Sequence, residues 1–181
     1  MSEDRTIISS AANPDFRLRS IESGDIEDLR GWKNLNKGSF FLKEDITPEQ
    51  QRVWFNHFCH RAADRMFVVE QRTDDGWEKI GCMGFRLLHE EGCVDAYNII
   101  RSRKIEPASF NMSDPFRTML AYAGRLHDNL PIRCKVLTQN PAVSWYERNG
   151  FSKVEQLEGF VLMELDKTTI ENLELNINSH L

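Results

Sequence analysis

The sequence predicts a mixed α+β fold, in which a mostly antiparallel central sheet of about seven strands is flanked by about four helices. Two observations carry this prediction. Three strand-like apolar runs follow one another between residues 65 and 100 with only short polar turns between them, which is typical of an antiparallel meander. Another apolar run, at 132–137, comes after a helix-length segment, which predicts a parallel crossover between the fourth and fifth strands.

The first part of the chain is predicted to form one strand and two helices. Residues 16–21 alternate apolar and polar side chains, as a half-buried strand does. Ser23-Gly24-Asp25 begins the first helix, after which apolar residues recur at helical spacing. Thr47-Pro48 begins the second, because threonine is a good N-cap and proline suits the first helical position. The residues of this helix expected to point inward are Val53, Trp54 and Phe58.

The meander is predicted from three runs and the turns that join them. Residues 65–71 and 78–88 are separated by Thr73-Asp74-Asp75-Gly76, and the Asp-Gly pair favours a tight hairpin turn. A polar turn at 89–92 then leads to the fourth strand at 94–100. Connections as short as these join antiparallel neighbours.

A third helix is predicted to carry the chain across the sheet to the fifth strand. Ser113 or Asp114 is expected to cap it, and Pro115 suits its first turn. The strand that follows is the apolar run 132–137. The residues expected to be buried on the helix are Phe116, Met119, Leu120, Ala123 and Leu126.

A short fourth helix is expected directly after the fifth strand. Asn140 can cap it, Pro141 suits its start, and Asn149-Gly150 ends it, because both of these residues tolerate the left-handed conformation. Two last strands, 152–157 and 159–165, then pair across a turn. The predicted order of elements is β-α-α-β-β-β-α-β-α-β-β.

The length of the chain suits one domain. A chain of 181 residues can bury one full hydrophobic core, and residues 15–167 are expected to form it. The segments 1–14 and 168–181 are polar and are expected to be a flexible N-terminal tail and a polar C-terminal tail. No internal repeat and no low-complexity segment is found in the sequence.

Composition and charge exclude some classes of partner. The net charge of −5 weighs against a nucleic-acid partner, which would need a basic face. The N-terminus lacks an apolar leader, and no run approaches the ~20 apolar residues of a membrane span, so a cytoplasmic protein without a membrane partner is expected. The four cysteines are not closely spaced, so they are expected to be reduced and buried, with no metal site: Cys59, Cys82, Cys93 and Cys134.

One stretch resembles a known family. Asn140-Pro141-Ala142, Tyr146 and Gly150-Phe151 are similar to the late motif of the Gcn5-related N-acetyltransferases, the GNAT superfamily. The predicted order of elements resembles that family's fold over residues 16–166. Two stretches near the front look like the branch that acts on amino sugars and protein N-termini: Trp32-Lys33-Asn34 and Gln50-Gln51 with Trp54-Phe55. The resemblance implies an acetyl-CoA-dependent N-acetyltransferase whose acceptor is a small-molecule amine, an amino sugar among the candidates. A homodimer is a further expectation.

The resemblance also implies where acetyl-CoA binds. In this family the pantetheine arm runs along the fourth strand, which here corresponds to Tyr97, Asn98, Ile99 and Ile100, and the arm is rich in amides that can pair with a strand backbone. In the late motif, Asn140 would contact the same arm.

The pyrophosphate of this family lies at the start of the following helix, where N–H groups and the helix dipole favour an anion. The family's loop has the form Arg/Gln-x-x-Gly-x-Gly/Ala. Here Asn111 takes the first position, Ser113 lies beside the helix start, and Asp114 and Phe116 stand in place of the glycines. Nearby cations are expected to compensate through side-chain contacts: Arg101, Arg103, Lys104 and Arg117.

The family's reaction is direct attack of an amine on the thioester, which needs a base for the amine and an acid for the leaving thiolate. Tyr146 occupies the position of the family's thiolate acid. The candidates for the base are Glu70, His89 and Asp95. A water chain is an alternative to all three.

The departure at Asp114 and Phe116 opens a second interpretation. A chain that kept the fold and lost the cofactor loop would be a binding module without acetyltransferase activity. An open groove lined by cations beside residues 97–117 would favour the enzyme.

Overall fold

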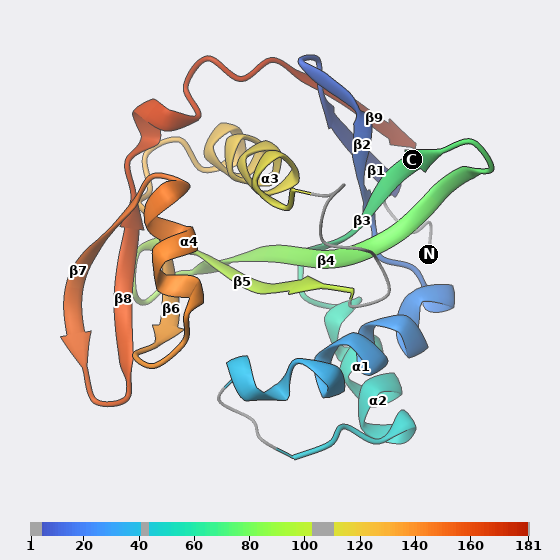
Figure 1. Ribbon diagram of the computed structural model, residues 1–181, viewed down its shortest axis with the longest axis horizontal. Helices are drawn as coiled ribbons and strands as arrows, with labels where there is room; N and C mark the ends of the chain where they lie inside the picture. Colours follow the sequence, from blue (N-terminus) through green and yellow to red (C-terminus); the bar gives the residue numbers. More distant parts are fainter. Residues whose placement is uncertain (1–4, 41–43, 103–110, 181) are drawn as a thin grey trace.

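The computed structural model describes residues 5–40, 44–102 and 111–180. It contains one nine-stranded sheet in the order β7-β8-β6-β5-β4-β3-β2-β1-β9 (Figure 1). The strands are β1 (Arg5–Ser10), β2 (Asn13–Ser20), β3 (Asp64–Thr73), β4 (Gly76–Leu88), β5 (Cys93–Arg101), β6 (Ile132–Leu137), β7 (Phe151–Leu157), β8 (Phe160–Leu165) and β9 (Leu175–His180). The helices are α1 (Ile26–Leu35), α2 (Pro48–Phe58), α3 (Ser113–Leu126) and α4 (Ala142–Arg148), with short 3-10 turns at Ser23–Asp25, Lys37–Ser39 and Lys167–Thr169.

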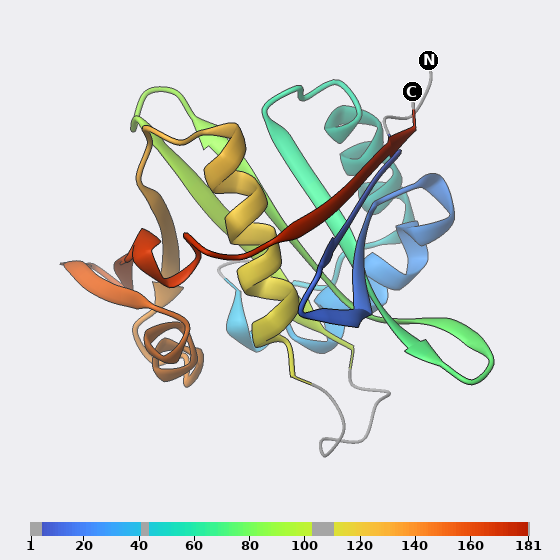
Figure 2. The same cartoon turned by 90° about the horizontal axis from the view of Figure 1, so that it is seen from above.

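The sheet is mostly antiparallel and is accompanied by four helices, so the α+β prediction is confirmed. The helices cover the sheet from both sides. α3 lies on one face and the pair α1 and α2 on the other (Figures 1 and 2). Both faces of the sheet are apolar, because the side chains of β3 alternate between them. Phe67 and Val69 pack in the cluster that includes residues of α3. Met66 and Val68 of the same strand pack in the cluster that includes α1 and α2. The predicted crossover is also confirmed, because β5 and β6 are parallel.

Parts of the two expected tails are strands, β1 near the N-terminus and β9 in the polar C-terminal segment, so the expectation of a flexible N-terminal tail is wrong over β1. β1 pairs with β2 and also with β9, from Arg5 opposite His180 to Ser10 opposite Leu175. Thr6, Ile8 and Ser10 alternate inward on β1 and are buried. Two of these three buried positions hold small polar residues, so the sequence shows no apolar–polar alternation there. The pairing of β1 with β9 joins distant parts of the chain, so no local sequence pattern predicts it.

Several expected side-chain positions also differ. On α2 the buried residues are Gln51 and Phe55, whereas Val53 is exposed, because the sheet-facing side of the helix is rotated from the expected one. Leu126 is exposed in the last turn of α3. Cys59 is exposed just after α2, while the other three cysteines are buried. Among the described residues, no helix combines the length and apolarity needed to cross a bilayer.

The parallel pair β5 and β6 separates soon after it forms. Only Val94 with Ile132 and Asp95 with Arg133 are paired, and beyond this point β6 pairs with β8 alone. β5 continues to Arg101 beside β4 and bulges on the way, since Gly84 faces Tyr97 while Cys82 already faces Ile100. Such a bulge takes one residue out of the ladder. The result is a wedge between two diverging strands.

Gly81 supports the end of β5 by letting the backbones approach closely. A Cβ at this position would lie against the carbonyl oxygen of Ile100 and 3.2 Å from the Cα of Arg101. Gly81→Ala is therefore expected to lower the free energy of unfolding by about 1–3 kcal/mol, as overpacking does. Urea unfolding measures the change.

Gly31 is the matched control, because it lies inside α1, and a methyl group added there would meet nothing within 4 Å beyond the backbone of its own helix. Gly31→Ala is expected to leave stability unchanged or raise it by up to about 1 kcal/mol, since alanine favours the helix. Equal effects of the two substitutions would contradict the close approach at Gly81.

Candidate functional site

The open side of the β5–β6 wedge contains a cavity of about 490 Å³, which we name the wedge cavity. Its walls are residues 95–101 of β5, Lys135 and Val136 of β6, the start of α4, and the segment that ends α1. A second cavity of about 410 Å³ lies toward the start of α3 and shares Ile99, Arg101 and Tyr146 with the first. Together they form one groove along β5, and Arg101 and Lys135 make its lining partly cationic.

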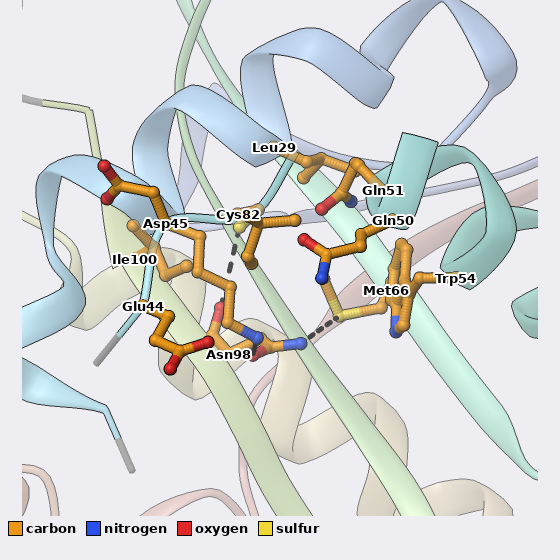
Figure 3. Close-up of a pocket in the computed structure, with 12 residues that line it drawn as sticks. Leu29, Glu44, Asp45, Gln50, Gln51, Trp54, Met66, Cys82, Asn98 and Ile100 are labelled. Carbon is orange, nitrogen blue, oxygen red and sulfur yellow. Dashed lines mark hydrogen bonds between the residues drawn. The ribbon is translucent and has the colours of Figure 1, made fainter. Parts of the chain in front are cut away.

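A third cavity, the front pocket, has a volume of about 280 Å³ and lies between α1, α2 and the sheet (Figure 3). Trp54 of α2 lies on one side, and Glu44 and Asp45 lie on another (Figure 3). Lys33 and Asn98 line both this pocket and the wedge cavity. The groove and the pocket therefore meet at these two residues.

Asn98 holds the junction in an unusual conformation. Its φ is 52°, the one positive value among the described residues other than glycine, and it lies in the bulge of β5. Its side-chain oxygen accepts a hydrogen bond from Lys33 Nζ at 3.1 Å, and its amide lies 3.8 Å from the sulfur of Met66. Left-handed backbone at asparagine is strained and persists where neighbouring contacts fix it. These contacts keep the bulge in one position at the narrowest point between the cavities.

Tyr146 lies on α4 and lines both halves of the groove. Its ring packs against those of Phe116, Trp145 and Phe151, at centroid distances of 5.8, 5.1 and 5.7 Å. Burial raises the pKa of the hydroxyl above its usual range, and the nearby Cys134 and Asp95 raise it further. Tyr146 therefore keeps its proton at neutral pH, as an acid must.

Asp95 lies at the closed end of the wedge, where the pairing with β6 stops. Its carboxylate accepts from Arg86 Nε at 2.9 Å. Burial raises the pKa of Asp95 above its usual range, although Arg86 acts in the opposite direction. The carboxylate lines the wedge cavity but is already paired with a cation.

The other two candidates for the base lie elsewhere. Glu70 is buried on β3 and accepts from Arg17 Nε at 2.6 Å and from Arg19 Nε at 3.0 Å. It lines none of the three cavities, and the two arginines explain its burial. His89 is exposed in the turn between β4 and β5. Neither residue reaches the junction at Asn98.

The start of α3 is built differently from the expected cap. The N-cap residue is Met112, and not Ser113 or Asp114, and its side chain makes no capping hydrogen bond. The side-chain oxygen of Asn111 accepts from the N–H of Ser113 at 2.9 Å. Asp114 instead accepts from the side chain of Asn13 at 2.9 Å and so is turned toward β2. Phe116 is fully buried beneath α4. Neither residue at the family's glycine positions therefore occupies the groove.

Few backbone donors remain at this helix start. The N–H of Ser113 is used by Asn111, Pro115 has none, and the N–H of Phe116 donates to the carbonyl of Met112. At most the amide of Asp114 is left for an anion in this turn. Arg117 follows, with its Nη2 donating to the carbonyl of Arg148 and its Nε buried without a partner among the described residues.

The remaining expected cofactor contacts divide into two groups. Asn98, Ile99, Ile100 and Arg101 line the wedge cavity, as does Asn140, whose side-chain oxygen also accepts from the N–H of Ala142 at 2.9 Å. Asn111 lines the part of the groove next to α3. Ser113 lies in the first turn of α3 and lines none of the three cavities. The expected contact at Arg103 falls outside the described residues.

Lys33 is the functional candidate that the sequence interpretation missed. It lies one residue beyond Trp32, which is buried on α1. The spacing does indicate where Lys33 lies, because Ile26, Leu29 and Lys33 follow one another at i, i+3 and i+7 and so share one helical face. A lysine in such an apolar series indicates either a snorkelling side chain or a site. Within the described residues, no cluster of His, Cys, Asp and Glu forms a metal site.

Comparison with known proteins gives matches among solved structures. No protein-family model matches the chain, and no curated protein matches it significantly. Apo FdhC, a nucleotide-linked sugar GNAT, is 16% identical and aligns over 87% of this chain and 89% of its own, with a TM-score of 0.70. A variant of the Vibrio cholerae spermidine N-acetyltransferase SpeG is 21% identical over 87% and 98%, with a TM-score of 0.70. The Vibrio cholerae spermidine N-acetyltransferase in complex with CoA and spermine is 22% identical over 88% and 100%, with a TM-score of 0.68.

Proposed function

The chain has the fold of the Gcn5-related N-acetyltransferases, and we propose that it transfers an acetyl group from acetyl-CoA to the amine of a small molecule. One observation supports this most strongly. The groove along β5 and the front pocket approach from opposite sides and meet at Asn98 and Lys33. Two substrates bound in these cavities would bring their reacting ends to the same point, which is what a direct transfer needs.

The groove suits the donor. β5 leaves β6 after Asp95, so its remaining backbone can pair with the amides of a pantetheine arm. A spermidine N-acetyltransferase with this fold binds CoA. Because the start of α3 offers few backbone donors, the phosphates in this chain rely on side-chain cations such as Arg101 and Lys135 at the groove.

The front pocket suits an amine. Glu44 and Asp45 place carboxylates at one side, of which Asp45 is paired with Lys37 at 2.8 Å, and Trp54 offers an aromatic wall. Such a lining favours a cationic molecule and disfavours an anionic one. An amino sugar, as expected from the sequence, and a polyamine, as acetylated by the spermidine enzyme, are the two acceptor classes to compare.

The chemistry assigned to this chain's residues is limited to proton transfer and positioning. The neutral amine attacks the thioester carbonyl, a C–N bond forms and the C–S bond breaks. Tyr146, kept protonated by its burial, donates a proton to the leaving sulfur. It regains a proton from the nitrogen that has become an amide.

Calorimetry with acetyl-CoA tests the proposal. If no heat of binding is measured at millimolar acetyl-CoA, the proposal is wrong. Turnover is followed by mass spectrometry of the acetylated amine, with spermidine, spermine, free amino sugars and nucleotide-linked amino sugars as acceptors. Turnover is not followed with thiol-reactive dyes, because the exposed Cys59 could react with the dye. Binding of acetyl-CoA without transfer to any of these amines would favour the binding module instead.

A further inference from the structure

Lys33 is a lysine at the meeting point of two cavities. It projects from α1 toward the sheet, and its Nζ donates to the side-chain oxygen of Asn98 at 3.1 Å. Lys33 lines the front pocket and the wedge cavity alike. The amine is therefore where an acceptor in the pocket and a thioester in the groove would meet.

The surroundings of Lys33 disfavour its charged form. No carboxylate among the described residues forms an ion pair with it, and Asp45 at the pocket is paired with Lys37 at 2.8 Å. Burial lowers the pKa of Lys33 below its usual range and Arg86 lowers it further, whereas Cys82 would raise it only as a charged thiolate. The pKa of Cys82 is itself raised to about 12 by burial, so this thiol is uncharged at neutral pH.

The other charged groups that face the junction act in both directions. Arg101 of β5 and Lys135 of β6 line the wedge cavity and oppose a further positive charge. Asp95 at its closed end is paired with Arg86, and Glu44 lies at the exposed side of the front pocket. The ring of Phe40 lies 5.4 Å from Lys33 Nζ and weakly favours the ammonium. These opposing contributions leave burial as the main reason why the pKa of Lys33 is lowered.

We propose that Lys33 Nζ, at the junction of the front pocket and the wedge cavity, accepts the proton that the acceptor ammonium must lose before it attacks the thioester. This inference rests on the proposed function and adds the base that it lacks. The acceptor ammonium gives one proton to Lys33 Nζ and becomes a neutral amine, which forms the C–N bond while the C–S bond breaks. Its second proton passes through Tyr146 to the sulfur, and Lys33 returns its own proton to water.

The first test measures the titration of Lys33 without any turnover. Trace acetic anhydride labels each neutral lysine of the wild-type protein at a series of pH values, and peptide mass spectrometry reads the labelling of each site. Lys153, an exposed lysine of β7, is the internal reference. The midpoint for Lys33 is expected below that of Lys153. A midpoint equal to or above that of Lys153 would overturn the proposal.

The second test separates a base from a mere cation. Lys33→Met and Lys33→Arg are both expected to lower kcat/KM at neutral pH roughly 100-fold, the usual range for loss of a general base. Acetyl-CoA affinity by calorimetry is expected to be unchanged, and the lost activity to return at high pH as the acceptor loses its proton unaided. Lys153→Met is the matched control and keeps full activity.

Two outcomes of the second test would contradict the role of Lys33. Wild-type activity in the Arg variant would show that only the positive charge matters. A higher KM with an unchanged kcat in the Met variant would show that Lys33 only holds the acceptor. Failure of the wild-type protein to bind acetyl-CoA is a separate result, which overturns the proposed function itself.

Discussion

Tyr146→Phe is expected to lower kcat roughly 100-fold while leaving acetyl-CoA affinity unchanged, because general acid catalysis contributes at least this much. The substitution keeps the ring that packs against Phe116, Trp145 and Phe151. It removes only the hydroxyl, whose burial raises its pKa and so keeps it protonated. The effect should therefore appear in the chemical step and spare folding. Steady-state kinetics, with calorimetry for the donor, measures both.

Tyr122 provides the matched control for this substitution. It lies on α3 against Phe67 and Phe85, and it lines none of the three cavities. Tyr122→Phe is expected to leave kcat unchanged. If Tyr146→Phe also retains full kcat, the thiolate leaves without an acid and Tyr146 serves only the packing of α4.

The second large effect is expected at Phe116. Its side chain is completely buried, with ring centroids 4.9 Å from Trp145 and 5.8 Å from both Tyr146 and Phe151. Phe116→Ala is expected to lower the free energy of unfolding by about 3–5 kcal/mol, since it removes a buried ring and leaves a cavity. Urea unfolding measures the loss.

Leu126 is the control on the same helix. It is 48% exposed in the last turn of α3, so Leu126→Ala is expected to change stability by no more than about 0.5 kcal/mol. A small loss at Phe116, comparable to that at Leu126, would show that α4 is not held by this aromatic cluster. The bulky residue at a family glycine position would then have no structural explanation.

Local patterns predicted most of the fold. Alternation and turn residues located the meander, and the capped helix start at Thr47 is present as a reciprocal capping box with Gln50. β1 and β9 were missed, because their burial depends on pairing between opposite ends of the chain. Val53 was placed inward because helical spacing alone does not say which face meets the sheet.

The candidate site was predicted less completely. A motif pointed to Tyr146, and position along the chain pointed to residues 98–101, and all of these line the groove. Glu70 lies on a predicted strand as a candidate base, but only the folded structure shows the two arginines that bind it. Lys33 acquires its chemical character from groups on β4 and β5, and no local pattern in α1 reports those neighbours.

The pairing of β1 with β9 has a consequence for how the chain folds. The two ends of the described chain lie side by side in the sheet, with Arg5 opposite His180 (Figure 2). The contacts between them have nearly the greatest sequence separation that the chain allows, and such contacts form late because their loop-closure entropy is large. During synthesis on the ribosome, the outer edge of β1 therefore stays unpaired until the last strand emerges. Until β9 covers it, that edge can pair with another molecule.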